Sequence, residues 1–332
     1  MGSLGEYVTS QDEHILITGA AGFIGQELMT SFLLSSSTLR LTITDVAQPP
    51  IPASCSAHSA RVTAIKSDLT APSAVKSLFT PRFSAVYLLH GLMSGGAEAN
   101  LELGWRVNFE SHRIILDYLR CQHPGTIVVF PSSLAVYGPP AAMGAVTSEL
   151  TCPQPQSSYG AQKLMTETYL NDMSRRGLLD GRIVRLPTVI VRPGLPSAAA
   201  SSFASGIVRE PLQGVPAVLP VAPSLEMWVC SPQTVVRNLI LVKDVPGDRF
   251  GLSRVVNLPG VTVTVQDILD ALRTVGGDEA LNLVEEKRDA KVEAIVNSWP
   301  ARFDIGRATG LGMVSDVSVL ETVGAFAANL RS

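Results

Sequence analysis

The chain has 332 residues, of which 46% are hydrophobic and 17% charged, so it is not a wholly disordered protein. Its formal net charge of -3 provides no global positive field, and neither nucleic acid nor a membrane is expected as a partner. The 4 cysteines and 5 histidines are scattered without ligand-like spacing, which predicts neither disulfides nor a metal site.

The first 14 residues contain no basic region followed by an apolar stretch, so no signal peptide is expected. No apolar run reaches the roughly 18 residues of a membrane span. These two observations predict a cytoplasmic protein.

The first half of the chain alternates short β-branched runs with segments of helical length. Strands are predicted at 14–18, 41–45, 62–65, 85–89, 126–130 and 182–186. Helices are predicted at 22–35, 97–121 and 158–176. This alternation predicts an α/β fold with a doubly wound, parallel sheet of the Rossmann type.

The second half begins with a change in amino-acid composition, because residues 187–224 are rich in Pro, Ser, Ala and Gly. Helices are expected again at 232–243, 265–275 and 318–330, and a late strand at 255–258. We therefore expect a nucleotide-binding domain and a smaller C-terminal lobe that binds substrate. The first is assigned 12–187 and 229–260, and the second 188–228 and 261–332.

A glycine-rich string joins the first predicted strand to the first helix. It contains Gly19, Gly22, Phe23, Ile24 and Gly25, in a GxxGxxG rather than a GxGxxG spacing. Glycines here allow a sharp turn that brings backbone N–H groups and a helix N-terminus against a pyrophosphate. A purely structural turn is the alternative, but the position between strand and helix favours dinucleotide binding.

An acidic residue, Asp45, ends the second predicted strand. A carboxylate there can accept both ribose hydroxyls of adenosine and repels a 2′-phosphate, which favours NAD over NADP. A solvated aspartate at a strand end is the alternative. Asp68 and Leu69, after the third strand, are lesser candidates for contacting adenine.

A tyrosine and a lysine, Tyr159 and Lys163, are four residues apart on a predicted helix and therefore share one face. A nearby cation favours the phenolate, so the tyrosine is expected to accept a proton near neutral pH. Ser132 and Ser133 follow the fifth strand, at the carboxyl edge of the sheet where ligands bind. Without this context, such a pair would be assigned to a solvated helix.

These residues together resemble the short-chain dehydrogenase/reductase family in its extended, epimerase-like branch, through the strings TGAAGFIG, ITD, SSLAVYG and SYGAQK. The resemblance implies that Ser133, Tyr159 and Lys163 are catalytic, with Ser133 preferred over Ser132 by its place in the family's SS-x-x-VYG pattern. It also implies that Asn108 takes part in a proton relay, with helix packing as the alternative.

Longer strings, such as SWPARFD at 298–304, are similar to family members that oxidise the 2-hydroxyl of a four-carbon sugar acid with NAD. The resemblance implies that Tyr159 accepts the hydroxyl proton, Lys163 binds the nicotinamide ribose and Ser133 holds the reacting oxygen. A homodimer through the helices at 97–121 and 158–176 is also implied.

Two further residues are candidates for substrate binding. Arg192, in the loop after the sixth strand, is expected to bind the substrate carboxylate, with a surface salt bridge as the alternative. Ser94, in the loop after the fourth strand, is expected to contact substrate hydroxyls.

The chain departs from the family pattern at His90 and Gly91 after the fourth strand, and at Pro131 before the serines. These positions lie near the expected cofactor site. The departures therefore leave the predicted hydride-transfer chemistry unchanged, but they make the identity of the substrate less certain. His90 is interpreted as a packing or surface residue, and an added catalytic role is the alternative.

Two other functions stay open. One is a nucleotide-sugar epimerase or dehydratase, but 195–230 offers only Arg209 as a cation for a second pyrophosphate. The other is a non-catalytic NAD-binding protein, which the presence of both Tyr159 and Lys163 disfavours.

Overall fold

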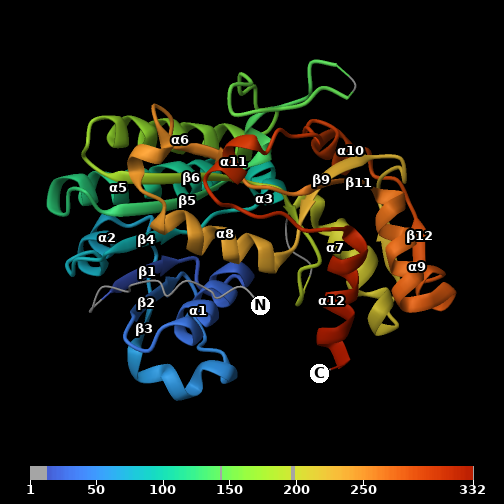
Figure 1. Ribbon diagram of the computed structural model, residues 1–332, viewed down its shortest axis with the longest axis horizontal. Coiled ribbons are helices and arrows are strands. Elements are labelled where there is room, and N and C mark those ends of the chain that lie inside the picture. The colour runs from blue at the N-terminus through green and yellow to red at the C-terminus, as the bar shows by residue number, and fades with distance from the viewer. Residues whose placement is uncertain (1–12, 143, 196–198, 332) are drawn as a thin grey trace.

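The computed structural model describes residues 13–142, 144–195 and 199–331. The larger domain is built around a 7-stranded parallel sheet in the order β10-β6-β5-β4-β1-β2-β3, shown in Figure 1. This order confirms the predicted Rossmann fold. The strands are β1 (His14–Thr18), β2 (Arg40–Asp45), β3 (Val62–Lys66), β4 (Ala85–Leu88), β5 (Ile127–Ser133), β6 (Asp180–Leu186) and β10 (Val255–Asn257).

Helices cover both faces of this sheet. On one face α1 (Phe23–Ser35) and α8 (Pro232–Asp244) bury their apolar sides, and on the other α2 (Pro72–Leu78), α5 (Ser111–Gln122) and α6 (Ser158–Arg175) do so. A sheet covered on both faces favours strands that are apolar throughout, as β4 and the first part of β5 are, whereas β2 alternates Leu and Ile with Thr and the edge strand β3 is partly exposed.

The helix predicted at 97–121 is not continuous. It is divided into α3 (Ser94–Ala99), α4 (Leu101–Trp105), a π-helical turn (Arg106–Glu110) and α5. The break occurs at Asn100, whose extended backbone ends α3 and whose side chain accepts a hydrogen bond from Leu103 N at 3.0 Å. The prediction of one helix is therefore wrong, because an N-cap within the segment starts a new helix.

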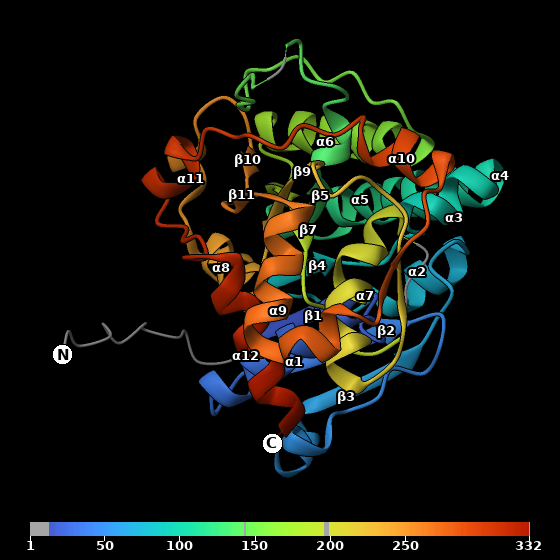
Figure 2. The same cartoon turned by 90° about the vertical axis from the view of Figure 1, so that its right-hand side faces the viewer.

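The smaller lobe is built from two short sheets and four helices within the described residues. One sheet has the order β11-β9-β7, and β12 pairs with β8 in the other. In Figure 2, α9 and α12 lie side by side at the front of this lobe. Its elements are β7 (Thr188–Val189), α7 (Phe203–Arg209), β8 (Ala217–Leu219), β9 (Glu226–Cys230), β11 (Val261–Thr264), α9 (Val265–Leu281), β12 (Val284–Glu286), α10 (Ala290–Val296) and α12 (Val319–Arg331).

One helix of the C-terminal segment, α11 (Gly306–Gly310), packs on the larger domain instead. It contacts β10, and the side chain of Arg307 donates hydrogen bonds to the carbonyls of Val255 and Ser253.

The domain boundaries assigned from the sequence remain a prediction, and the first of them, residue 12, lies outside the described residues. The return of the chain to the larger domain is visible in α8, which packs on β5 and β6, and in β10, which pairs with β6. No helix in the described ranges is long and apolar enough to span a membrane.

Candidate active site

The glycine loop lies at the carboxyl end of β1 and is packed too tightly for side chains at two positions. Gly19 has φ of +67°, and a Cβ there would lie 2.5 Å from the backbone nitrogen of His90. A Cβ on Gly25 would lie 2.7 Å from the Cα of Ala20, where α1 crosses the loop. These glycines therefore allow the close approach of strand, loop and helix that the sequence motif predicts.

The N-terminus of α1 is open toward this loop. Its N-cap is Gly22, which offers no side-chain cap, and the first turn, beginning with Phe23 and Ile24, holds no acidic residue. The free N–H groups and the positive end of the helix dipole suit an anion. The site thus fits the pyrophosphate of a dinucleotide.

Asp45 lies beside the loop at the end of β2. Its carboxylate accepts hydrogen bonds from the backbone nitrogens of Ala21 at 3.0 Å and Val46 at 2.7 Å. This contact places the acidic group next to the glycine loop, where the adenosine ribose of a dinucleotide lies in this fold.

The lesser adenine candidates are held by other contacts. Asp68 accepts hydrogen bonds from the backbone and hydroxyl of Thr70, and these bonds lower the pKa of Asp68. Leu69 is buried on the face of the sheet that α2, α5 and α6 cover. An adenine contact by either residue stays a prediction.

A cleft of about 190 Å³ lies at the carboxyl end of the sheet. Ser133 reaches it from the end of β5, and Tyr159 and Lys163 from the first two turns of α6. Ser94 and Arg192 line the same cleft. The structure therefore brings these five residues together from four separate parts of the chain, whereas Asn108, the fourth residue predicted to be catalytic, does not line the cleft.

Burial dominates the acidity of Tyr159. It raises the pKa of the phenol to about 12, while the Arg192 guanidinium and a hydrogen bond with Ser133 act in the opposite direction. The prediction that a neighbouring cation brings the pKa of Tyr159 near neutrality is therefore wrong. The physical reason is that desolvation of the phenolate outweighs the attraction of the cation.

The ammonium group of Lys163, one helical turn after Tyr159, is held in place by contacts with β5. It donates a hydrogen bond to the carbonyl of Pro131 at 2.9 Å and lies 4.5 Å from the centroid of the Phe130 ring. Burial lowers the pKa of Lys163 to about 8, against the opposing effect of Glu167. Because the lysine binds a backbone carbonyl, the unusual proline does not disturb this contact.

Asn108 lies in the π-helical turn and its side chain is fully buried. The amide accepts a hydrogen bond from Leu92 N at 2.6 Å and donates to Leu92 O at 3.0 Å and to Gln162 Oε1 at 2.8 Å. These bonds fix the segment after β4 against α6. They match the packing alternative, and a part in proton relay stays a prediction.

His90 is built into the protein interior. Its Nδ1 lies 2.7 Å from Thr18 Oγ1, its Nε2 lies 3.0 Å from Ser111 Oγ, and its ring stacks on His112 with centroids 4.1 Å apart. Burial lowers the pKa of His90 to about 3, so the ring is neutral at physiological pH. This environment supports the packing interpretation over an added catalytic role.

The segment after β4 connects the two lobes. Ser94 Oγ accepts a hydrogen bond from the backbone of Ala200 in the smaller lobe at 3.1 Å. Glu98, at the other end of α3, accepts one from the backbone of Ser158 at 3.0 Å, directly before Tyr159. Ser94 therefore positions the small lobe, and its predicted contact with substrate hydroxyls stays a prediction.

Three side chains that line the cleft contain a buried polar atom without a hydrogen-bond partner among the described residues. These atoms are Ser132 Oγ, Arg192 Nε and Trp299 Nε1. Seven other buried polar atoms of the described residues are also unpaired, so it is the shared position of these three in one cleft that makes them candidates for ligand contacts. The sequence gives no signal for Trp299 beyond the SWPARFD string that contains it.

The sequence of the domain that forms this site matches a known protein family. A family model described as the NAD dependent epimerase/dehydratase family matches residues 15–245. The chain belongs to the NAD-dependent epimerase/dehydratase family. This result confirms the resemblance to the extended, epimerase-like branch of the short-chain dehydrogenases.

Two curated members of the NAD-dependent epimerase/dehydratase family are similar along most of their length. D-erythronate dehydrogenase of Cupriavidus necator is 43% identical, over 94% of this chain and 97% of its own. The enzyme of the same name from Haemophilus influenzae is 38% identical, over 91% and 95%. The chain is therefore an NAD-dependent oxidoreductase.

A solved structure of the family gives the same architecture. The nucleoside-diphosphate-sugar epimerase from Agrobacterium tumefaciens superimposes with a TM-score of 0.86 at 34% identity, covering 97% of this chain and 96% of the other. NAD is the cofactor, and the open start of α1 with Asp45 beside it fits this group.

Proposed function

We propose that this enzyme oxidises the 2-hydroxyl of a small sugar acid, similar to D-erythronate, to the 2-oxo acid. The curated relatives that carry this name support the proposal.

The environment of Arg192 is the observation that carries the proposal. Its side chain is half-buried in the wall of the cleft with a buried Nε, has no acidic partner among the described residues, and lies near a second cation, Arg209. Burial and this like charge both lower the pKa of Arg192. A buried cation without a counter-ion is costly unless a ligand supplies the anion, and a carboxylate matches its planar geometry.

The residues of the cleft divide the reaction between them. Arg192 holds the carboxylate, and Ser133 donates a hydrogen bond that orients the oxygen on the reacting carbon. Because burial keeps the phenol protonated, Tyr159 must release its own proton to solvent before it takes the hydroxyl proton, while the hydrogen on the same carbon leaves as hydride. NAD, when bound, supplies the ring that accepts this hydride. Lys163 provides the positive charge that stabilises the phenolate and holds the nicotinamide ribose.

The proposal is tested by NADH formation at 340 nm with tetronates and other 2-hydroxy acids, each paired with its uncharged amide. We expect turnover of the acids and little of the amides. Enzyme that binds NAD but turns over none of the acids would contradict the proposed function.

Replacing Arg192 with Met should lower kcat/KM for the acid by about 10- to 100-fold, the usual effect of losing a hydrogen-bonded ion pair. The loss should appear chiefly in KM, measured by steady-state kinetics. Because Met has a similar length and removes an unpaired buried charge, the melting temperature should not fall. An unchanged KM would show that the carboxylate binds elsewhere.

A nucleotide-sugar epimerase remains the second candidate because of the Agrobacterium structure. Arg209, the cation expected to bind a second pyrophosphate, is buried, donates to the Arg192 carbonyl at 2.8 Å and pairs with Glu210. It is therefore occupied by protein groups. Tightly retained NAD and no net NADH formation with any acid would favour the epimerase.

Asp45→Ala should lower kcat/KM for NAD by about tenfold and raise the use of NADP relative to NAD. The physical reason is that the carboxylate that repels a 2′-phosphate is lost. Asp45→Asn is the matched control, since it keeps the hydrogen-bond acceptors but not the charge. If neither variant changes the NAD/NADP ratio of kcat/KM, Asp45 does not select the cofactor.

We also propose a homodimer through the helical surface formed by α4 and α6. Two large apolar side chains on it are exposed, Leu101 by 52% and Met165 by 41%. Apolar residues exposed together favour an interface. Multi-angle light scattering should give twice the chain mass at micromolar concentration, and Met165→Glu should shift it toward the monomer. A monomeric wild type would refute the dimer.

A further inference from the structure

We infer that Trp299 is a specificity-determining residue, whose indole N–H donates a hydrogen bond to a substrate hydroxyl beyond the reacting carbon. The inference rests on the proposed function and adds to it what recognises the far end of the sugar acid. It starts from an indole nitrogen that is buried in the cleft wall and has no acceptor within the described residues.

Buried indole N–H groups usually have a hydrogen-bond partner, because leaving one unpaired is unfavourable. Trp228, which is buried, follows this rule, since it donates to the carbonyl of Leu258 at 3.4 Å. Trp299 departs from it and also lines the cleft. The missing acceptor is therefore expected on a molecule bound there.

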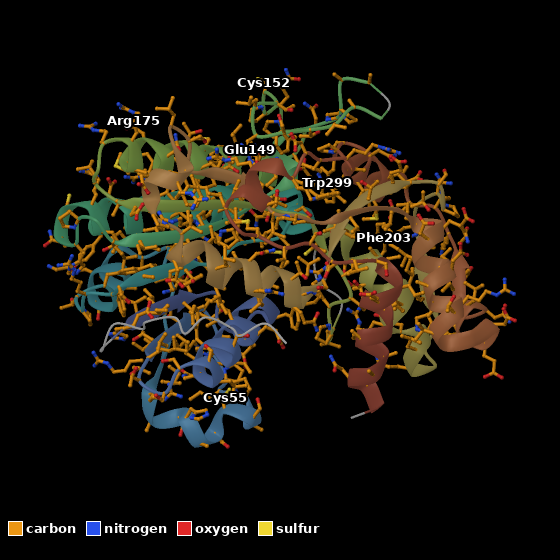
Figure 3. All side chains as sticks on the ribbon, in the orientation of Figure 1. Cys55, Glu149, Cys152, Arg175, Phe203 and Trp299 are labelled. Atoms are coloured by element: carbon orange, nitrogen blue, oxygen red, sulfur yellow. The ribbon has the colours of Figure 1, made fainter. Side chains whose placement is uncertain are left out.

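The segment that carries Trp299 is held firmly by both lobes. Trp299 follows α10 of the smaller lobe and packs partly against its core. A few residues later the chain pairs with Thr147 of the larger domain, through Thr147 N to Arg302 O at 2.8 Å and Asp304 N to Thr147 O at 2.9 Å. Figure 3 shows Trp299 near the junction of the lobes. A donor fixed in this way is preorganised for its acceptor.

The roles proposed for Arg192, Ser133 and Tyr159 leave one part of the substrate unassigned. Ser94, the other predicted contact of the substrate hydroxyls, already accepts a hydrogen bond from Ala200 N. Arg192 is assigned to the carboxylate, and Ser133 with Tyr159 to the oxygen on the second carbon. A trihydroxybutanoate has two more hydroxyls, on its third and fourth carbons. Trp299 provides a rigid N–H donor for one of them. A site built around such a bond should reject acids that lack these hydroxyls.

The test compares 2,3,4-trihydroxybutanoate with 2-hydroxybutanoate in wild type and Trp299→Phe, which removes the N–H and keeps an aromatic ring. We expect kcat/KM for the trihydroxy acid to fall about 3- to 10-fold, as for one lost hydrogen bond. The value for 2-hydroxybutanoate should stay the same. Trp228→Phe is the matched control and should leave the ratio of the two acids unchanged.

A second readout is the ¹⁵N–¹H spectrum of the 3 indole groups, recorded with NADH and each acid. The Trp299 resonance, identified by its loss in Trp299→Phe, should shift with the trihydroxy acid and not with 2-hydroxybutanoate. An equal loss of kcat/KM for both acids, or an indole resonance that neither acid moves, would overturn the inference alone. Wild-type enzyme that turns over no hydroxy acid would overturn the proposed function and this inference with it.

Discussion

Tyr159→Phe is expected to lower kcat by about 10²- to 10⁴-fold, the range for loss of a positioned general base. The variant removes only the phenolic hydroxyl, and the ring still fills its place in the cleft beside Ser133. Folding and NAD affinity should therefore stay close to wild type. The measurements are turnover at saturating substrate and NAD binding by fluorescence titration.

Tyr87→Phe is the matched control, because its phenol is also buried and donates to the carbonyl of Leu239 at 3.1 Å, within the core. Its loss should lower the free energy of unfolding by about 1 kcal/mol and leave kcat nearly unchanged. If Tyr159→Phe kept more than about a tenth of wild-type turnover, the proton would have to go to another group.

Lys163→Met is expected to lower kcat/KM for NAD by about 10²- to 10³-fold, comparable to the loss of one charged donor from a catalytic site. The ammonium that lies between Pro131 and the Phe130 ring is lost, and with it the cation assigned to ribose and phenolate. Lys76→Met, which changes an exposed lysine on α2, should have no effect. Equal kinetics for both variants would contradict the role of Lys163.

The same residue gives a pH dependence with a definite sign. The pKa of Lys163 is lowered to about 8, so its positive charge is present below that pH and lost above it. In wild type, the affinity for NAD, measured by fluorescence titration, should therefore decrease as pH rises through about 8. Tyr159 and His90, with pKa values of about 12 and about 3, titrate outside this range. A profile that is flat from pH 7 to 9.5 would refute the assignment.

The sheet domain and the chemistry of its short motifs follow from the sequence alone. Short apolar and β-branched runs predict all seven strands of the sheet, because both faces of these strands are covered by helices. The glycines of the loop after β1 were predictable because the close approach of backbone to backbone at Gly19 and Gly25 excludes a side chain. Tyr159 and Lys163 were recognised because four residues return to the same face of a helix.

Only the tertiary structure decided which charges and donors face one another. Burial raises the pKa of Tyr159 although a lysine lies one turn away, and desolvation depends on packing that spacing does not encode. The division of the 97–121 helix depends on a side-chain cap at Asn100, and α7 and β7 in the Pro- and Ser-rich segment are stabilised by contacts within the smaller lobe. Trp299 lies 140 residues after Tyr159, and only folding brings its N–H to the same cleft.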